Sequence, residues 1–403
     1  MNTTQLISRL EFLPPEEKTP ELAELEKELR DHAKYFNDLI TQIATTGVLT
    51  DEIRKEREER GKMMRRLAEK VLAKLAALET LAHLKETYET QVSRYRALGW
   101  LVKKKEKEGI VGVDKKFYPI PSFDTVKDVI SEQGELFTYK HSQGFKNIML
   151  VPIGMSYVEM YTKLQSEYER YSKDVDGTLG GLYHSDISGV TKITKISKEF
   201  FCHDSMAKEK KLEYYPVTLE SKDKAVHRAK SKTELLAHGH FPGWELHVLP
   251  ENLLLVEGKN NLVIGDRPVF EPKTRCEEYL EILAGKKERK DGISVKDAEG
   301  KSVYRGEVGL IPEVWVALAL EQLYTTNLVY QKAIKKPNGL SNGTMSTGTL
   351  LMGTLINDTD VSTSYFSIDY DMNILVLKSH ATKRSTLNDF LDPDVCTTSV
   401  KIC

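Results

Sequence analysis

The chain has 403 residues, of which 40% are apolar and 29% are charged. This length exceeds the usual size of a single hydrophobic core, so we expect two or three structural units. A formal net charge of -2 provides no overall basic field, which argues against nucleic acid as a partner.

The amino-terminal end and the cysteines are typical of a cytoplasmic protein. The segment from Met1 to Lys18 contains acidic residues and lacks the apolar core of an export signal. No run of about 18 or more apolar residues occurs in the sequence, so no membrane span is expected. The cysteines show neither a paired spacing nor neighbouring histidine ligands, which predicts free thiols at Cys202, Cys276, Cys396 and Cys403.

Two long helices are predicted in the first part of the chain. Thr19 and Pro20 provide an N-cap and a first-turn proline. The apolar residues that follow alternate spacings of three and four, which is typical of a coiled-coil seam with one polar position; they are Leu22, Leu25, Leu29, His32, Phe36, Leu39 and Ile43. Gly47 interrupts this helix, and a second one runs from Thr50 to about Leu98. Residues 1–108 are therefore predicted to form a coiled-coil arm, either as a helical hairpin or as an intermolecular coiled coil of a homo-oligomer.

Residues 109–403 have the pattern of a mixed α/β domain. A short buried strand is expected at Asn147–Ile153 and a helix at Tyr157–Tyr171. A further helix should begin at Pro312, after the glycine-containing turn Arg305–Gly309. Its apolar residues cover more than one stripe, which predicts burial on two sides.

An aspartate pair offers a candidate phosphate site. Asp174 and Asp176 stand in the sequence Asp-Val-Asp-Gly-Thr, which matches the nucleophile motif of haloacid-dehalogenase-like phosphatases. In that family the first aspartate attacks phosphate from the exposed end of an apolar strand. The preceding residues are polar and have a helical period, so an Asp-Gly turn is the favoured interpretation.

The densest histidine cluster offers a candidate metal site. His238, His240 and His247 could supply three nitrogen ligands. However, Pro242 and Gly243 predict a turn between them. Residues 245–249 alternate like a half-exposed strand, with Glu245 and His247 on one face. A structural turn and strand are therefore preferred to a metal site.

The C-terminal region differs from the rest of the chain in composition. Residues 332–403 contain no Glu, Gln or Trp. Glycine-rich residues 338–353 are predicted to form a loop, and the segment from Asp358 to Thr386 shows little periodicity apart from a core strand at Ile374–Leu377. A last strand is expected at Thr398–Ile402. Ser, Tyr, Asn and Asp in an irregular segment are typical of a recognition loop.

Several motifs carry a resemblance to a known family: Gly243–Leu246, Gly265–Pro268, Glu278–Leu280, Tyr304–Trp315 and Leu350–Gly353. In this order they are similar to an uncharacterised family of candidate-phyla (patescibacterial) proteins. The resemblance covers residues 109–403 and implies a C-type-lectin-like fold that is also formylglycine-enzyme-like. It further implies a variable C-terminal segment, here about 358–403, of the kind that retroelements diversify.

The composition of the C-terminal segment partly fits such diversification. Mutation of adenines in Asn-type codons cannot produce Glu, Gln, Lys, Met or Trp. Between Val361 and Asp394 only three residues belong to that set, namely Met372, Lys378 and Lys383.

The expected fold class is therefore α+β, with a long-helix coiled-coil hairpin followed by a C-type-lectin-like mixed α/β domain. We expect a non-enzymatic module that binds a protein or a small ligand at its C-terminal face. No metal or cofactor is expected, because the sugar-binding triplets of calcium-dependent lectins and a paired-cysteine site are lacking from the sequence. The predicted contact residues are Ser362, Ser364, Phe366, Ile368, Tyr370, Asp371, Asn373 and His380.

Two functions of other classes stay open. One is a hydrolase that uses the three histidines on a metal, or Asp174 and Asp176 on phosphate. The other is a structural coiled-coil adaptor with an inert C-terminal face.

Overall fold

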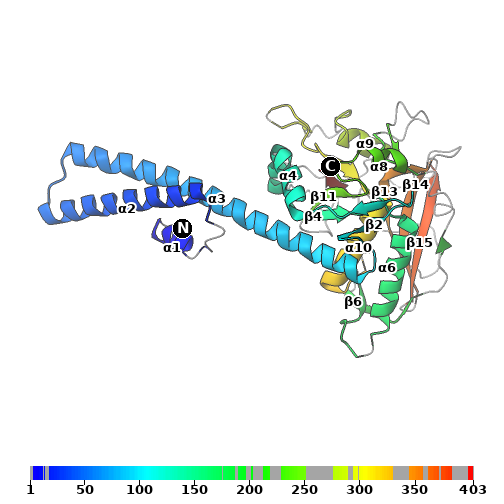
Figure 1. Ribbon diagram of the computed structural model, residues 1–403. Coiled ribbons are helices and arrows are strands. Elements are labelled where there is room, and N and C mark those ends of the chain that lie inside the picture. The colour runs from blue at the N-terminus through cyan, green and yellow to red at the C-terminus, as the bar shows by residue number, and fades with distance from the viewer. Residues whose placement is uncertain are drawn as a thin grey trace. The chain divides into compact units, whose positions relative to one another are not determined.

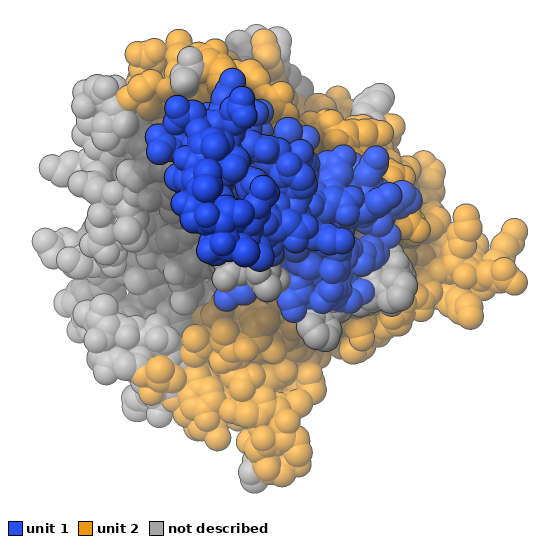
Figure 2. All heavy atoms as spheres, turned by 90° about the vertical axis from the view of Figure 1, so that its left-hand side faces the viewer, with its two compact units in different colours: residues 1–87 blue, residues 88–403 orange. Residues whose placement is uncertain are grey.

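The structure is a computed structural model. It forms two compact units, residues 1–87 and residues 88–403, which Figure 2 shows in different colours. The sequence-based division lay at residue 108, whereas the second compact unit begins inside a long helix. The described residues are 3–11, 13, 18–174, 176–186, 189–196, 201–202, 212–217, 228–250, 276–288, 294–297, 299–329, 345–356, 362–371, 374–383 and 398–402.

The first unit is helical. It contains α1 (Thr3–Glu11), α2 (Pro20–Thr46) and most of α3 (Asp51–Ala97). The side chain of Thr19 caps α2 by accepting from the backbone N–H of Leu22 at 3.2 Å. Gly47 ends α2 in the left-handed conformation at φ 65°. Both ends of α2 therefore follow from local sequence signals, as predicted.

Helices α2 and α3 form an antiparallel hairpin (Figure 1). Lys74 lies 2.7 Å from Glu21, and Arg60 lies 2.8 Å from the Nδ1 atom of His32. Helix α1 contributes to the same hydrophobic core. This core comprises Leu6, Leu10, Leu22, Leu29, Leu67, Val71 and Leu75. The predicted hairpin is confirmed, and pairing of the arm with a second copy stays a prediction.

The second unit combines helices and sheets. Among the described residues its other helices are α4 (Phe123–Glu132), α5 (Gly134–Ser142), α6 (Tyr157–Ser172), α8 (Lys232–His238), α9 (Cys276–Leu283) and α10 (Pro312–Thr326). Helix α10 starts at Pro312 as predicted, and every residue from Pro312 to Leu320 is buried. It packs against α6 and β4 (Phe145–Val151), so the expected burial on two sides is confirmed.

A four-stranded antiparallel sheet lies beside α10. Its order is β12 (Glu307–Gly309), β16 (Thr398–Lys401), β11 (Glu245–Pro250) and β4. The predicted strands at β4 and β16 are confirmed. The expectation that β11 is half-exposed was wrong, because residues 245–249 are all buried. Its polar face is buried against Tyr215 and Lys401, as described below.

The edge of β4 is covered by the last turns of α3. The side-chain amide of Gln91 donates to the carbonyl of Ile148 at 2.5 Å and accepts from the N–H of Leu150 at 3.0 Å. The hydroxyl of Tyr95 donates to the Leu150 carbonyl at 2.7 Å. Gln91 thus makes the pair of hydrogen bonds that a neighbouring strand would make, which closes an otherwise open edge.

A larger sheet contains the C-terminal strands. Its path is β10, β9, β13, β14, β15 and β7, with β8 also paired to β15. The long members are β13 (Met345–Ile356), β14 (Ser362–Asp371) and β15 (Ile374–Lys383); the short ones are β7 (Lys195–Ile196), β8 (Phe201–Cys202), β9 (Leu212–Tyr214) and β10 (Lys230–Ser231). The loop predicted at 338–353 and the irregular segment predicted at 358–386 were therefore wrong in part. Pairing with distant strands decides strand formation more than local composition does.

Two small sheets also occur in the described part of the unit. One comprises β1 (Val102–Lys104), β2 (Lys107–Val111) and β3 (Phe117–Pro119), and the other β5 (Leu182–Asp186) and β6 (Gly189–Ile193). The fold is mixed α/β with an N-terminal helical region, as expected. Across the described residues, no helix has both the length and the apolar character needed to cross a membrane.

Candidate functional site

Six of the eight predicted contact residues lie on one strand of the larger sheet. Ser362, Ser364, Phe366, Ile368 and Tyr370 occupy alternate positions of β14, and Asp371 is its last residue. His380 lies on the adjacent strand β15, and Asn373 lies outside the described residues. The backbone therefore brings most of the predicted set onto two neighbouring strands.

The strand register divides this set between two faces. Strands β14 and β15 pair over ten residues, with Tyr365 opposite His380 and Asp371 opposite Ile374. Successive residues of a strand belong to opposite faces of its sheet. Asp371 and His380 therefore share a face with Tyr365, whereas the five alternate residues that begin at Ser362 share the other face.

The two faces differ in composition. The face with Phe366, Ile368 and Tyr370 also includes the β15 residues paired with them, Ser379, Leu377 and Leu375. The other face includes the polar residues Ser367, Asp369, Asp371, Lys378 and His380. Phe366, Ile368 and Tyr370 thus form an aromatic and aliphatic strip on one face of β14, whereas the other face is mixed, because it also includes Tyr365, Ile374 and Val376.

A buried polar cluster surrounds β11. Glu245 and His247 lie on one face of β11, as predicted, with Glu245 Oε2 3.3 Å from His247 Nε2. The hydroxyl of Tyr215 donates to Glu245, and Lys401 forms an ion pair with the same carboxylate. Lys401 also lies 4.1 Å from the centroid of the Tyr215 ring. Tyr215 adopts a left-handed φ of 58°, a conformation that costs energy for a residue with a side chain.

Burial and charge set the pKa values in this cluster. Burial alone would raise the pKa of Glu245, but the charge of Lys401 and the hydrogen bond from His247 outweigh it and lower the pKa to about 2. Burial lowers the pKa of His247 below its ordinary value of 6.5, and the contact with Glu245 only partly opposes this. His247 is therefore neutral in the folded protein at neutral pH.

The folded protein is expected to lose stability when the pH falls below about 6.5. His247 has a lowered pKa in the folded state, so the unfolded chain binds its proton first and unfolding becomes easier as pH falls. Urea unfolding at pH 7.5 and pH 5.5 should show a smaller pH dependence in His247→Gln than in the wild type. Leu249→Ala is the control, because it should lower stability equally at both pH values; an unchanged pH dependence in His247→Gln would contradict the assignment.

The three histidines considered for a metal do not come together. His240 is exposed, whereas His247 is fully buried in the β11 cluster. The turn predicted between them is confirmed, because the N–H of Trp244 donates to the carbonyl of Phe241 at 2.9 Å. In the part of the chain that the structure describes, no three His, Cys, Asp or Glu residues are grouped to hold a metal ion.

Asp174 and Asp176 hold a turn after α6. The N–H groups of Leu179 and Gly181 both donate to Asp174 Oδ2 at 3.1 Å. The hydroxyl of Thr178 lies 3.0 Å from Asp176 Oδ1. A helix precedes these aspartates, and their oxygens accept bonds from their own loop, so the predicted turn is confirmed.

A second buried ion pair joins α8 to α10. Lys232 Nζ lies 2.9 Å from Glu313 Oε1 and also donates to the carbonyl of Met155. The hydroxyl of Tyr214 donates to the same Glu313 oxygen at 2.9 Å. Burial raises the pKa of Glu313, although Lys232 opposes the shift. This contact attaches the start of α10 to α8 and β9.

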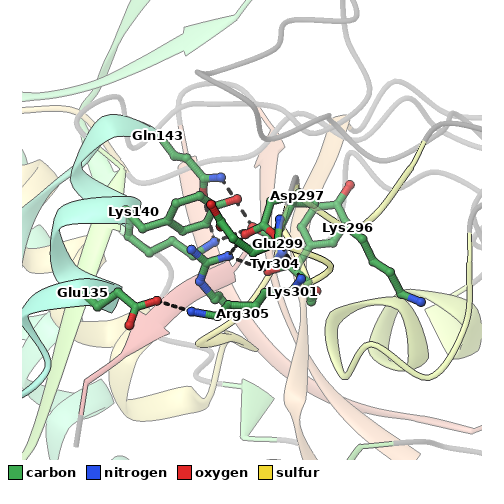
Figure 3. A network of polar contacts seen from close by, with 12 residues as sticks. Glu135, Lys140, Gln143, Lys296, Asp297, Glu299, Lys301, Tyr304 and Arg305 are labelled. Atoms are coloured by element: carbon green, nitrogen blue, oxygen red, sulfur yellow. Dashed lines mark hydrogen bonds and ion pairs between the residues drawn. The ribbon is translucent and has the colours of Figure 1, made fainter.

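A third buried ion pair fixes the turn before α10, and Figure 3 shows its lysine, Lys140, with polar residues around it. Lys140 on α5 lies 2.7 Å from Glu307 Oε1, and both side chains are fully buried. The same ammonium group donates at 2.8 Å to Gln143 Oε1 and to the carbonyl of Val303. All three of its donors thus have partners, which is the condition for an ammonium group inside a protein.

More exposed charges surround this pair. Arg305 pairs with Asp297, and its guanidinium carbon lies 3.4 Å from the centroid of the Tyr139 ring. Lys301 pairs with Glu135 of α5. Residues 301–309 are therefore held to α5 by the buried Lys140–Glu307 pair, by the outer Lys301–Glu135 pair and by the contact of Arg305 with the Tyr139 ring.

Sequence reasoning did not predict these three buried carboxylates as ion-pair partners. Each glutamate stands among apolar residues, and a charge in such a segment needs a partner; this signal was available for Glu245, Glu307 and Glu313. The partners themselves could not be predicted, because Lys140 lies 167 residues from Glu307 along the chain and Lys232 lies 81 residues from Glu313.

No protein-family model, curated protein or solved structure matches this chain. Its function is therefore inferred from sequence and geometry.

Proposed function

We propose that the protein is a non-enzymatic binding module that carries its recognition surface on β14 and β15. The observation that supports this most directly is the placement of the predicted contact residues on two strands that pair over ten residues. Such paired strands provide a regular scaffold on which neighbouring side chains make one continuous surface.

The aromatic strip of β14 supplies the anchors in this proposal. Phe366, Ile368 and Tyr370 are at alternate positions, and aromatic residues contribute most of the binding energy in many interfaces. Ser362 and Ser364 continue the strip with small polar groups that adapt to a partner. Asp371, the last residue of β14, would contact such a partner only at the end of the strand, and His380 lies on the opposite face, outside this strip. A C-type-lectin-like fold and retroelement diversification of this segment are further parts of the proposal.

Stability measurements test whether the strip serves binding or folding. Phe366→Ala and Tyr370→Ala are each expected to lower the free energy of unfolding by less than about 1 kcal/mol, as at most surface positions. Leu246→Ala is the matched core variant, since Leu246 is fully buried in β11, and should cost about 2–5 kcal/mol. Losses at Phe366 and Tyr370 as large as that at Leu246 would place the strip in the core and end the proposal.

A crosslinking experiment tests binding itself. A photoreactive residue at Ser364 should capture a discrete protein or ligand from a lysate of the source cells. The same residue at Thr162, an exposed position on α6, should not capture it. Adding Phe366→Ala and Tyr370→Ala should remove the crosslink at Ser364, and equal capture from both positions would contradict a specific surface.

A further inference from the structure

The three-stranded sheet β1–β2–β3 has one buried face and one exposed face. Ile110 lies opposite Tyr118 in the register, and these side chains are 0% and 7% exposed. Val111 lies opposite Phe117 on the other face. On that face Val102 is 41% exposed and Val111 48% exposed. The sheet therefore packs on the domain with one side and presents apolar side chains to solvent with the other.

Outside the helical hairpin, most of the exposed large apolar residues among the described ones lie on or next to this sheet. Ten large apolar side chains are exposed among the described residues, and six of them belong to the helical hairpin, residues 20–97. Of the other four, three lie on this sheet or directly after β2, namely Val102, Val111 and Val113. Isolated exposed apolar residues are normal, but neighbouring ones with a polar rim mark interaction surfaces.

The rim of this apolar patch is basic. Residues 102–117 contain six lysines and three carboxylates, in a chain whose overall charge is negative. Two of the carboxylates have partners already, since Glu108 lies 2.8 Å from Arg96, and Asp114 accepts from the Tyr118 hydroxyl at 2.7 Å and pairs with Lys116 at 3.3 Å. The six lysines are all exposed: Lys103, Lys104, Lys105, Lys107, Lys115 and Lys116.

The arrangement of the lysines is unfavourable for folding. Lys104 lies directly opposite Lys107 in the antiparallel pair β1–β2, and like charges at such positions destabilise a sheet. Lys105 and Lys115 adopt left-handed φ values of 57° and 62°, where glycine or asparagine is favoured. Lysines on an edge strand can discourage aggregation, but Lys107 lies on the central strand. An anion bound between Lys104 and Lys107 would relieve their repulsion.

We propose that the exposed face of the β1–β2–β3 sheet binds an acidic, amphipathic segment of a partner protein. Carboxylates of the partner pair with Lys104 and Lys107, and its aliphatic side chains cover Val102 and Val111. A single-stranded nucleic acid fits this face less well, because nucleic-acid platforms stack several bases on aromatic rings. On this face only Phe117 could stack on a base. Its ring already has a neighbour, because Lys104 Nζ lies 5.9 Å from the ring centroid. This surface is separate from the one on β14 and does not depend on it.

A short fluorescent peptide in which glutamates alternate with leucines tests the proposal by anisotropy. The full chain should bind it, and Lys104→Glu with Lys107→Glu should weaken binding at least about tenfold. The matched control is Lys173→Glu with Lys286→Glu, which changes the net charge equally at two exposed lysines elsewhere and should leave binding nearly unchanged. Equal losses in the two double variants, or no binding by the wild type, would overturn the proposal.

Two further measurements distinguish an acidic, amphipathic protein segment from other anionic partners. Val102→Thr with Val111→Thr should weaken binding of the alternating peptide but not of polyglutamate. Lys104→Glu alone should weaken peptide binding while slightly raising the unfolding midpoint, because it places opposite charges across the strands. Tighter binding of a single-stranded oligonucleotide or of phosphatidylserine vesicles than of the peptide would contradict a protein segment as the partner.

Discussion

Replacing Lys140 by methionine is expected to destabilise the second unit by about 3–5 kcal/mol. Glu307 would then keep a fully buried carboxylate without its cation, since the two side chains lie 2.7 Å apart and are both 0% exposed. Urea unfolding followed by tryptophan fluorescence measures the effect, because Trp100, Trp244 and Trp315 all belong to this unit.

The double variant Lys140→Met with Glu307→Leu separates the pair from its surroundings. Removing both charges should recover much of the lost stability, because a buried ion pair is often no better than apolar side chains of similar volume. Lys173→Met is the exposed control. The side chain of Lys173, which pairs with Glu169, is 72% exposed, so this substitution should change stability by less than about 0.5 kcal/mol. A Lys140→Met protein as stable as the wild type would contradict a charged Glu307 in the core.

Replacing Gln91 by leucine is expected to cost about 2–4 kcal/mol. The substitution leaves the carbonyl of Ile148 and the N–H of Leu150 without the bonds from Gln91, and each buried backbone group left unpaired costs about 1–3 kcal/mol. Hydrogen exchange provides the specific readout, because the amide of Leu150 should lose protection before its neighbours in β4.

A leucine on the opposite side of the same helix turn is the control. Ser93 is exposed, so Ser93→Leu should leave both stability and the Leu150 exchange rate close to those of the wild type. If the Leu150 amide stays protected in Gln91→Leu, then another group covers the edge of β4 and the role assigned to Gln91 is wrong.

Local signals predicted those parts of the fold that local interactions decide. The cap at Thr19, the stop at Gly47 and the start at Pro312 each depend on residues within one helical turn, and all three are confirmed. Such signals act before any tertiary contact exists, which is why the sequence reveals them.

Contacts between segments that are far apart in the sequence explain why other predictions of strands and of solvent exposure were wrong. A loop was predicted at residues 338–353 from their glycine content, yet β13 begins at Met345 and pairs with β14 and β9 over much of its length. The alternation in β11 correctly placed Glu245 and His247 on one face but wrongly suggested solvent there. Lys401 and Tyr215, which cover that face, come from other parts of the chain. The candidate contact residues could be named from composition, whereas their division between two faces required the register of β14 and β15.

Strand β16 lies in the interior of its sheet, between β12 and β11. A ribosome therefore completes β11 and β12 well before it delivers the residues that join them. Until residue 401 has left the exit tunnel, both strands keep backbone groups without their final partners, so this sheet closes only after β16 has been synthesised. A nascent chain stalled before β16 should consequently be a better chaperone client than one that already includes β16.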